Sequence, residues 1–230
     1  IVATVRALKY NGGVAKADLN NENLEALEKG IPNLLRHVNT IKNVYKLPCV
    51  VAINAFPTDT DEEMDFIREH CAERGVRVAL SEVFAKGGEG AIDLPEKVVA
   101  ACEDPSAFHP IYERDRPVEE KIETICREIY GAAGVEYSAA AKKAIKDITA
   151  LGKGGLPICM AKTQYSLSDN QKLLGRPEGF TIHVGEVRLS AGAGFIVVQT
   201  GDIMTMPGLP KVPAAENINV DENGKITGLF

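Results

Sequence analysis

Two short apolar segments on either side of a helical pattern are the feature that most restricts how this chain can fold. Residues 48–54 form a nearly continuous apolar run, and residues 76–81 form a second short strand-like run. Runs of this kind are typical of parallel strands covered on both faces. Between them, Met64, Phe66 and Ile67 belong to a helix that Asp59 or Thr60 can cap and Gly75 can end. The sequence therefore predicts a right-handed βαβ unit.

Further patterns extend this α/β region in both directions. A long helix is predicted over residues 22–45, and Pro32 should kink or split it. A glycine-rich turn after residue 81 leads to another helix over residues 91–101. Residues 1–5 read as an apolar strand, and natural domains rarely begin inside a buried strand. We therefore expect the chain to be part of a longer protein whose upstream half is missing.

The pattern changes after a proline-rich linker. Residues 104–117 contain three prolines, and a soft domain boundary is expected at about residues 110–117. Beyond it, the sequence predicts two helices and then three short β segments: 118–130, 138–151, 158–162, 180–189 and 195–200. The predicted fold class is α/β. Residues 1–112 would belong to a P-loop-NTPase-like, mostly parallel sheet with helices on both faces, and residues 113–230 would form a smaller α+β domain.

Composition excludes several classes of function. The 230 residues carry a formal net charge of −6, and the basic residues are scattered. Nucleic-acid binding would need them clustered. No apolar stretch reaches the roughly 18 residues of a membrane helix. Five cysteines without a CxxC pair favour a reducing, cytoplasmic compartment, with neither disulfides nor a metal site.

The first candidate site follows the first apolar strand. Asn54, Phe56 and Asp59 come just after its carboxyl end, where open α/β sheets bind ligands. The arrangement is loosely similar to the Asn-Lys-x-Asp loop with which GTP-binding proteins read a base. The alternative is a plain helix cap, and spacing alone does not decide between the two. The acidic run 59–63 is interpreted as a solvated first helical turn.

The second candidate site follows the next strand. Leu80, Phe84 and Lys86 precede or enter a turn with three glycines, which let a backbone approach a ligand closely. Taken alone, this segment is as well explained by a flexible loop and a core phenylalanine. Two such loops on successive strands, however, would place Phe56 and Phe84 across one crevice. Aromatic stacking there would contribute about 1–3 kcal/mol per ring. A third motif, Gly192-x-Gly194, is interpreted as tight strand packing.

Several longer strings resemble one enzyme family, formate–tetrahydrofolate ligase, over essentially the whole chain. They are ATVRALK (3–9), VAIN (51–54), AKGGEG (85–90), LPICMAK (156–162), LGRPEGF (174–180), RLSAGAGF (188–195), MTMPGLP (204–210) and the terminal GLF (228–230). The resemblance implies the carboxyl-terminal part of an ATP-dependent ligase that forms 10-formyltetrahydrofolate, ADP and phosphate. In the family, formate attacks the γ-phosphate, and the folate N10 amine then takes the formyl group.

The resemblance also implies residue roles and partners. In the family, two aromatic residues at the positions of Phe56 and Phe84 sandwich the pterin ring. The second is often tryptophan, so Phe84 is a departure. Leu80 lines the same family pocket, and Asn54 and Lys86 are expected to border it. ATP, Mg²⁺ and a monovalent cation would serve the full enzyme, a cytoplasmic homotetramer, and none is expected to bind this chain tightly.

Phosphate-handling residues are expected upstream, because no Gly-x-x-x-x-Gly-Lys-Ser/Thr loop is present. The sequence thus predicts no catalytic residue within these 230 and no activity for the chain alone. The alternative hypothesis is a non-catalytic binding or assembly module. A GTPase-like nucleotide binder is a weaker one, since it would need the absent loop. From the residues alone, the crevice between Phe56 and Phe84 could hold folate or adenine.

Overall fold

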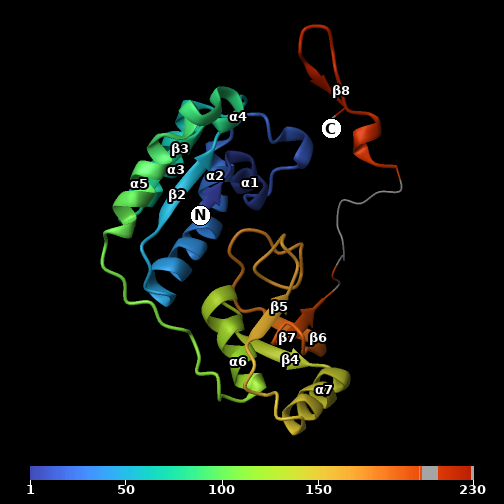
Figure 1. The fold of residues 1–230 in the computed structure, drawn as a ribbon. Coiled ribbons are helices and arrows are strands. Elements are labelled where there is room, and N and C mark those ends of the chain that lie inside the picture. The colour runs from blue at the N-terminus through green and yellow to red at the C-terminus, as the bar shows by residue number, and fades with distance from the viewer. Residues whose placement is uncertain (202, 204–211, 229–230) are drawn as a thin grey trace.

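The computed structural model describes residues 1–201, 203 and 212–228, and its first part is built on a parallel sheet (Figure 1). The strand order is β1 (Val2–Ala3), β2 (Val50–Asn54) and β3 (Arg77–Ser81), with both neighbouring pairs parallel. The predicted βαβ unit is therefore confirmed. The segment expected to be a strand over residues 1–5 is shorter, because Thr4 caps a helix that begins at Val5.

Helices cover both faces of this sheet. Helices α2 (Leu24–Asn39) and α3 (Asp61–Ala72) share one core with β2 and with the Val78 and Leu80 side chains of β3. Helix α5 (Asp93–Cys102) packs against β2 and β3, and Lys97 Nζ donates to the Val78 carbonyl at 2.7 Å. The first part also contains α1 (Val5–Asn11), α4 (Val83–Lys86), 3₁₀ turns at Lys16–Asp18 and Gly87–Ala91, and a π turn at Thr40–Val44.

Pro32 does not split the long helix, contrary to one of the two outcomes predicted. Helix α2 runs through Pro32 in one piece and continues into the π turn. A proline removes one backbone hydrogen bond from a helix interior. The apolar stripe of α2 is buried in the core. The stabilisation from burying that stripe outweighs the cost of the missing hydrogen bond. Its buried members include Leu27, Ile31, Leu34 and Val38.

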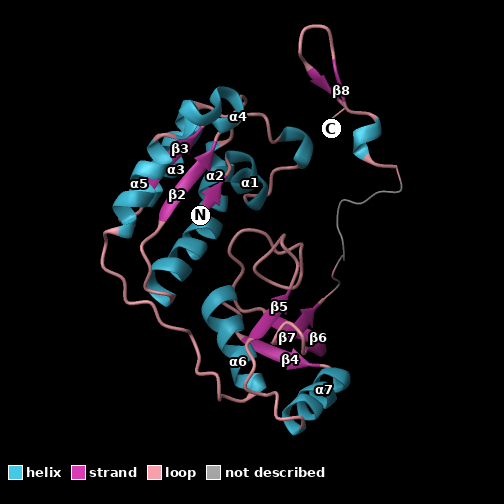
Figure 2. Ribbon diagram, in the orientation of Figure 1, coloured by secondary structure: helices cyan, strands magenta, loops and turns pink. Residues whose placement is uncertain are grey.

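The second part has a mixed sheet, as the secondary-structure colouring shows (Figure 2). Its order is β4 (Gly134–Tyr137), β6 (Thr181–Ser190), β7 (Phe195–Thr200) and β5 (Ile158–Ala161); only β6 and β7 pair antiparallel. Helices α6 (Val118–Ile125) and α7 (Ala139–Ala150) and a π turn at Cys126–Tyr130 accompany it. Strand β4 was not predicted. Gly194, with φ of +78°, lies in the turn between β6 and β7, so the Gly-x-Gly motif serves a hairpin.

Separate cores support the two parts. One joins buried side chains between Ala3 and Val76, and the other joins those between Val118 and Val198. Residues 103–117 connect them, and the boundary expected at residue 112/113 stays a prediction. A 3₁₀ turn at Ala214–Glu216 and a small hairpin of β8 (Asn219–Val220) and β9 (Ile226–Thr227) complete the described chain. The MTMPGLP string lies outside the described residues.

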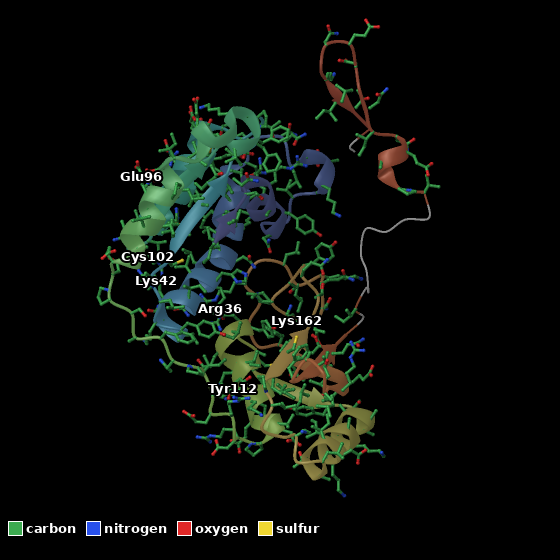
Figure 3. All side chains as sticks on the ribbon, in the orientation of Figure 1. Arg36, Lys42, Glu96, Cys102, Tyr112 and Lys162 are labelled. Atoms are coloured by element: carbon green, nitrogen blue, oxygen red, sulfur yellow. The ribbon has the colours of Figure 1, made fainter. Side chains whose placement is uncertain are left out.

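Direct hydrogen bonds join the two parts, and Arg36, labelled in Figure 3, makes three of them. The Arg36 guanidinium on α2 donates to the carbonyls of Glu128 at 2.6 Å and of Arg127 and Ile129 at 3.2 Å, at the end of the second part's π turn. A cation is favourable there because the last carbonyls of a helix carry partial negative charge. Gly175 adds two contacts: its carbonyl accepts from Asn33 and its N–H donates to Asn11. None of the helices in the described residues is long and apolar enough to cross a membrane.

Candidate functional site

The carboxyl ends of β2 and β3 lie side by side, which brings the two predicted loops together. Asn54 and Ser81, the last residues of these strands, are register partners, and the Ala55 N–H extends the pairing to the Ser81 carbonyl at 3.0 Å. Phe56 follows β2 and Phe84 follows β3, so both aromatic residues leave the same edge of the sheet. This is the edge at which open parallel sheets bind ligands. That the two rings flank one heterocycle stays a prediction.

Phe56 is held in a tight turn and is open to solvent on part of its ring. Its backbone N–H donates to Asp59 Oδ2 at 2.9 Å, and its carbonyl accepts from the Asp59 N–H at 3.0 Å. The Arg6 guanidinium lies over the ring, 5.7 Å from its centroid. The side chain is nevertheless 39% exposed. One face of Phe56 thus carries a cation–π contact, and a flat ligand would take the other.

Phe84 is the most exposed of these side chains, at 81%, on the short helix α4. The glycine-rich segment after it is ordered as a 3₁₀ turn rather than a flexible loop. Gly87 has φ of +60° and ψ of −145°, a conformation that only glycine adopts easily. The Gly90 carbonyl oxygen accepts from the Glu82 N–H at 2.8 Å, and a Cβ at Gly90 would lie 2.6 Å from the Glu82 carbonyl oxygen. The glycines fix the short helix that carries Phe84.

The other predicted site residues occupy three different environments. Asn54 is half-buried at the end of β2. Leu80 is half-buried and packs against the core of the first part. Lys86 is exposed and forms an ion pair at 2.7 Å with Glu82, the residue before α4. Of the set, only Phe56 and Phe84 present a large exposed apolar surface at the sheet edge.

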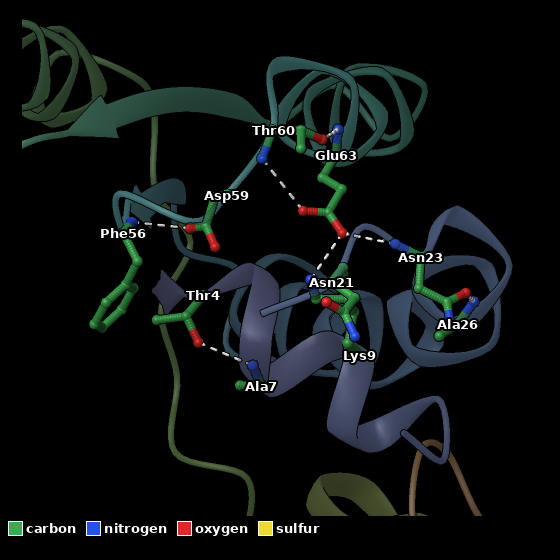
Figure 4. Close-up of polar contacts among 10 residues, drawn as sticks. All are labelled: Thr4, Ala7, Lys9, Asn21, Asn23, Ala26, Phe56, Asp59, Thr60 and Glu63. Atoms are coloured by element: carbon green, nitrogen blue, oxygen red, sulfur yellow. Dashed lines mark hydrogen bonds and ion pairs between the residues drawn. The ribbon is translucent and has the colours of Figure 1, made fainter. Parts of the chain in front are cut away.

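A buried ion pair lies beside the segment that carries Phe56 and Asp59 (Figure 4). Lys9 Nζ lies 2.8 Å from Glu63 Oε1, and both side chains have an exposed fraction of 0%. Lys9 also donates to the Asn21 carbonyl at 2.9 Å, and Glu63 Oε1 accepts from the Asn23 N–H at 2.9 Å. The interpretation of residues 59–63 as a solvated turn is therefore wrong for Glu63. Its carboxylate joins α1, the segment before α2 and the start of α3.

A helix cap is present in this motif, and it is compatible with a site. Thr60 Oγ1 accepts from the Glu63 N–H, and Glu63 Oε2 accepts from the Thr60 N–H, both at 3.3 Å. This reciprocal pair is a capping box. Thr60 is thus the cap, and Asp59 is left to hold the turn at Phe56. The spacing Thr60-x-x-Glu63 is a signal that could have identified Glu63 in the sequence.

Asp59 has an unusual environment for a carboxylate. Its Oδ2 accepts from Phe56, whereas Oδ1 is buried and has no hydrogen-bond partner among the described residues. Burial raises the pKa of the Asp59 carboxyl, and the hydrogen bond from Phe56 partly opposes that rise. The described residues contain no group of three metal-ligating side chains.

The chain matches a known protein family over its whole length. A family model described as formate–tetrahydrofolate ligase matches residues 1–230. The match spans both parts of the structure and includes the two loops at the sheet edge. The chain belongs to the formate–tetrahydrofolate ligase family.

Proposed function

We propose that this chain supplies the pterin-binding side of an ATP-dependent ligase that joins formate to tetrahydrofolate. The products would be 10-formyltetrahydrofolate, ADP and phosphate. The observation that carries the proposal is the pair of exposed phenylalanines, Phe56 and Phe84, after the carboxyl ends of adjacent parallel strands. Family membership supports a folate ring over adenine as the flat ligand.

The proposed role of these residues is to bind and orient the folate. Phe56 and Phe84 would stack on the pterin, with Asn54, Leu80 and Lys86 around its edge. Fixing the ring fixes the N10 amine relative to the formyl donor, and such positioning can supply a large share of a rate enhancement. The turn hydrogen bonds at Asp59 and the glycines after Phe84 support the proposal, because they hold both aromatic residues on ordered backbone.

Direct titration of the chain with tetrahydrofolate tests this role. Stacking on two faces contributes roughly 1–3 kcal/mol each. Association costs an estimated 4–15 kcal/mol. We therefore expect weak binding, with a dissociation constant on the order of 1 mM or weaker. In NMR titrations the largest shift changes should fall at Phe56, Phe84 and their neighbours. Shift changes that avoid both loops, or no binding at any accessible concentration, would reject the pterin site.

Phosphate chemistry is assigned to residues outside these 230. The sequence lacks the glycine-rich loop and lysine that cradle the β- and γ-phosphates. ATP, Mg²⁺ and a monovalent cation would therefore be held elsewhere in a complete cytoplasmic, tetrameric enzyme. We expect the pure chain to form no 10-formyltetrahydrofolate from formate, ATP and tetrahydrofolate, as followed by mass spectrometry of the product. Turnover by this chain alone would contradict the assignment.

A binding or assembly module without catalysis is the alternative function. A module that binds another ligand or serves assembly should show no shift changes at Phe56 and Phe84 with tetrahydrofolate, so the same titration separates the two proposals.

A further inference from the structure

A cavity of about 380 Å³ lies beside the Phe56 loop, between the two parts of the chain. Helix α1 and the segment after it form one side, and the loop after β5 forms the other. The side chains that matter for its chemistry are Arg6, Tyr10, Lys16, Leu19 and Tyr165. Nothing in the pterin-binding role of Phe56 and Phe84 uses this space.

Arg6 connects the cavity to the proposed ring site. Its guanidinium lies 5.7 Å from the centroid of the Phe56 ring, and the same side chain lines the cavity. The Phe56 ring, whose other face would carry the pterin, therefore lies next to the cavity at Arg6. Any extension of that ligand toward α1 would pass Arg6 first.

The walls of the cavity combine apolar surface with positive charge. Tyr10, Leu19 and Tyr165 supply aromatic and aliphatic contacts, whereas Arg6 and Lys16 are cations. Within the part of the chain that the structure describes, neither cation forms an ion pair. The lining thus suits a ligand segment with an aromatic ring and carboxylates.

The loop that carries Tyr165 is fixed by its own internal contacts. Lys162 Nζ donates to the carbonyls of Thr163 at 2.8 Å and Ser168 at 3.0 Å, and also to that of Ser166. The same ammonium lies over the Tyr130 ring, 5.1 Å from its centroid. The second part therefore presents Tyr165 to the cavity on an ordered loop.

We infer that this cavity binds the aminobenzoyl-glutamate arm of tetrahydrofolate, an inference that rests on the proposed function. The aminobenzoyl ring packs between Tyr10 and Tyr165, and the two glutamate carboxylates meet Arg6 and Lys16. The second part of the chain thereby contributes Tyr165 to folate binding. This gives the junction between the two parts a role in recognising the substrate.

Comparing ligands with and without the arm tests the inference on the 230-residue chain. The ligands are tetrahydrofolate, 6-methyltetrahydropterin, which lacks the arm, and p-aminobenzoylglutamate, which lacks the ring. An exposed ion pair is worth up to about 1 kcal/mol, so Lys16→Gln should weaken tetrahydrofolate about two- to fivefold. Tyr165→Ala should weaken it at least about fivefold through lost stacking. Neither variant should change 6-methyltetrahydropterin binding, and Lys16→Arg should retain the tetrahydrofolate affinity.

The matched control is Lys153→Gln, an exposed lysine of the second part outside the cavity. It should leave all three dissociation constants unchanged. p-Aminobenzoylglutamate should shift the NMR signals of Arg6, Tyr10 and Tyr165 even in a Phe84→Ala variant. Equal affinity for tetrahydrofolate and 6-methyltetrahydropterin would overturn the arm site and leave the ring site standing. Equal weakening of tetrahydrofolate and 6-methyltetrahydropterin binding by Lys16→Gln would also overturn the arm site and leave the ring site standing. Binding of neither pterin would overturn the proposed function, and the arm site with it.

Discussion

Replacing Glu63 by glutamine should lower the free energy of unfolding by about 3–5 kcal/mol, the usual cost of removing one partner from a buried ion pair. The variant keeps the size and shape of the side chain. It leaves the Lys9 ammonium in a site with an exposed fraction of 0%, where the remaining acceptors, the Asn21 carbonyl and the new amide oxygen, carry no charge. Urea unfolding followed by circular dichroism measures the loss.

Two further variants make this result specific. Glu62→Gln changes the neighbouring exposed carboxylate and should stay within about 0.5 kcal/mol of the parent. Combining Lys9→Met with Glu63→Gln removes both charges and should recover much of the loss, as coupled residues do in a double-mutant cycle. If Glu63→Gln is as stable as Glu62→Gln, the pair does not stabilise the fold. If the double variant is no more stable than Glu63→Gln alone, the loss of stability has a cause other than the unpaired lysine.

The Lys9–Glu63 pair also connects the core to the site. Glu63 receives hydrogen bonds from the Thr60 and Asn23 N–H groups, and Thr60 directly follows the turn between Phe56 and Asp59. The loop that carries Phe56 is therefore fixed at its far end by a charge inside the protein. A stable core and an ordered Phe56 depend on the same carboxylate.

The general fold followed from the sequence because local patterns agreed with the tertiary structure. The runs that became β2 and β3 have apolar centres, Val50–Ile53 and Val78–Leu80, as is typical of parallel strands that are covered on both faces. Strand β4 did not have this property. Gly134–Tyr137 is four residues long with an exposed Glu136, and it exists through its pairing with β6. Periodicity in so short a segment does not separate strand from loop.

Parts of the site could not be predicted because they depend on contacts between residues that are far apart in the sequence. Asp61, Glu62 and Glu63 all suit the start of a helix, and the capping-box spacing distinguishes Glu63 only as the partner of Thr60. Its burial depends on Lys9, which lies 54 residues earlier in the chain. The same is true of Arg6, whose contact with Phe56 crosses fifty residues of chain. By contrast, Phe56 and Phe84 could be located because strand direction alone places their loops together.

Replacing Phe84 by alanine in an enzyme that also contains the phosphate-binding residues should raise the KM for tetrahydrofolate about 5- to 150-fold. This corresponds to roughly 1–3 kcal/mol of stacking on one ring face. The KM values for ATP and formate should not change, because Phe84 lies at the folate end of the proposed site. Stability should change by less than about 0.5 kcal/mol, since the side chain is 81% exposed. Steady-state kinetics with each substrate varied in turn measures the effect.

Phe84→Trp should keep or lower the KM for tetrahydrofolate, because it enlarges the same stacking face. The matched control is Phe108→Ala. Phe108 is also exposed, at 56%, but stacks on Tyr45 with the ring centroids 6.1 Å apart, away from the sheet edge. Its loss should leave the folate KM unchanged. A solvent-exposed phenylalanine does not contribute to the core, so an effect confined to tetrahydrofolate identifies Phe84 as a ligand contact. An unchanged folate KM in Phe84→Ala would show that the exposed ring does not bind the substrate.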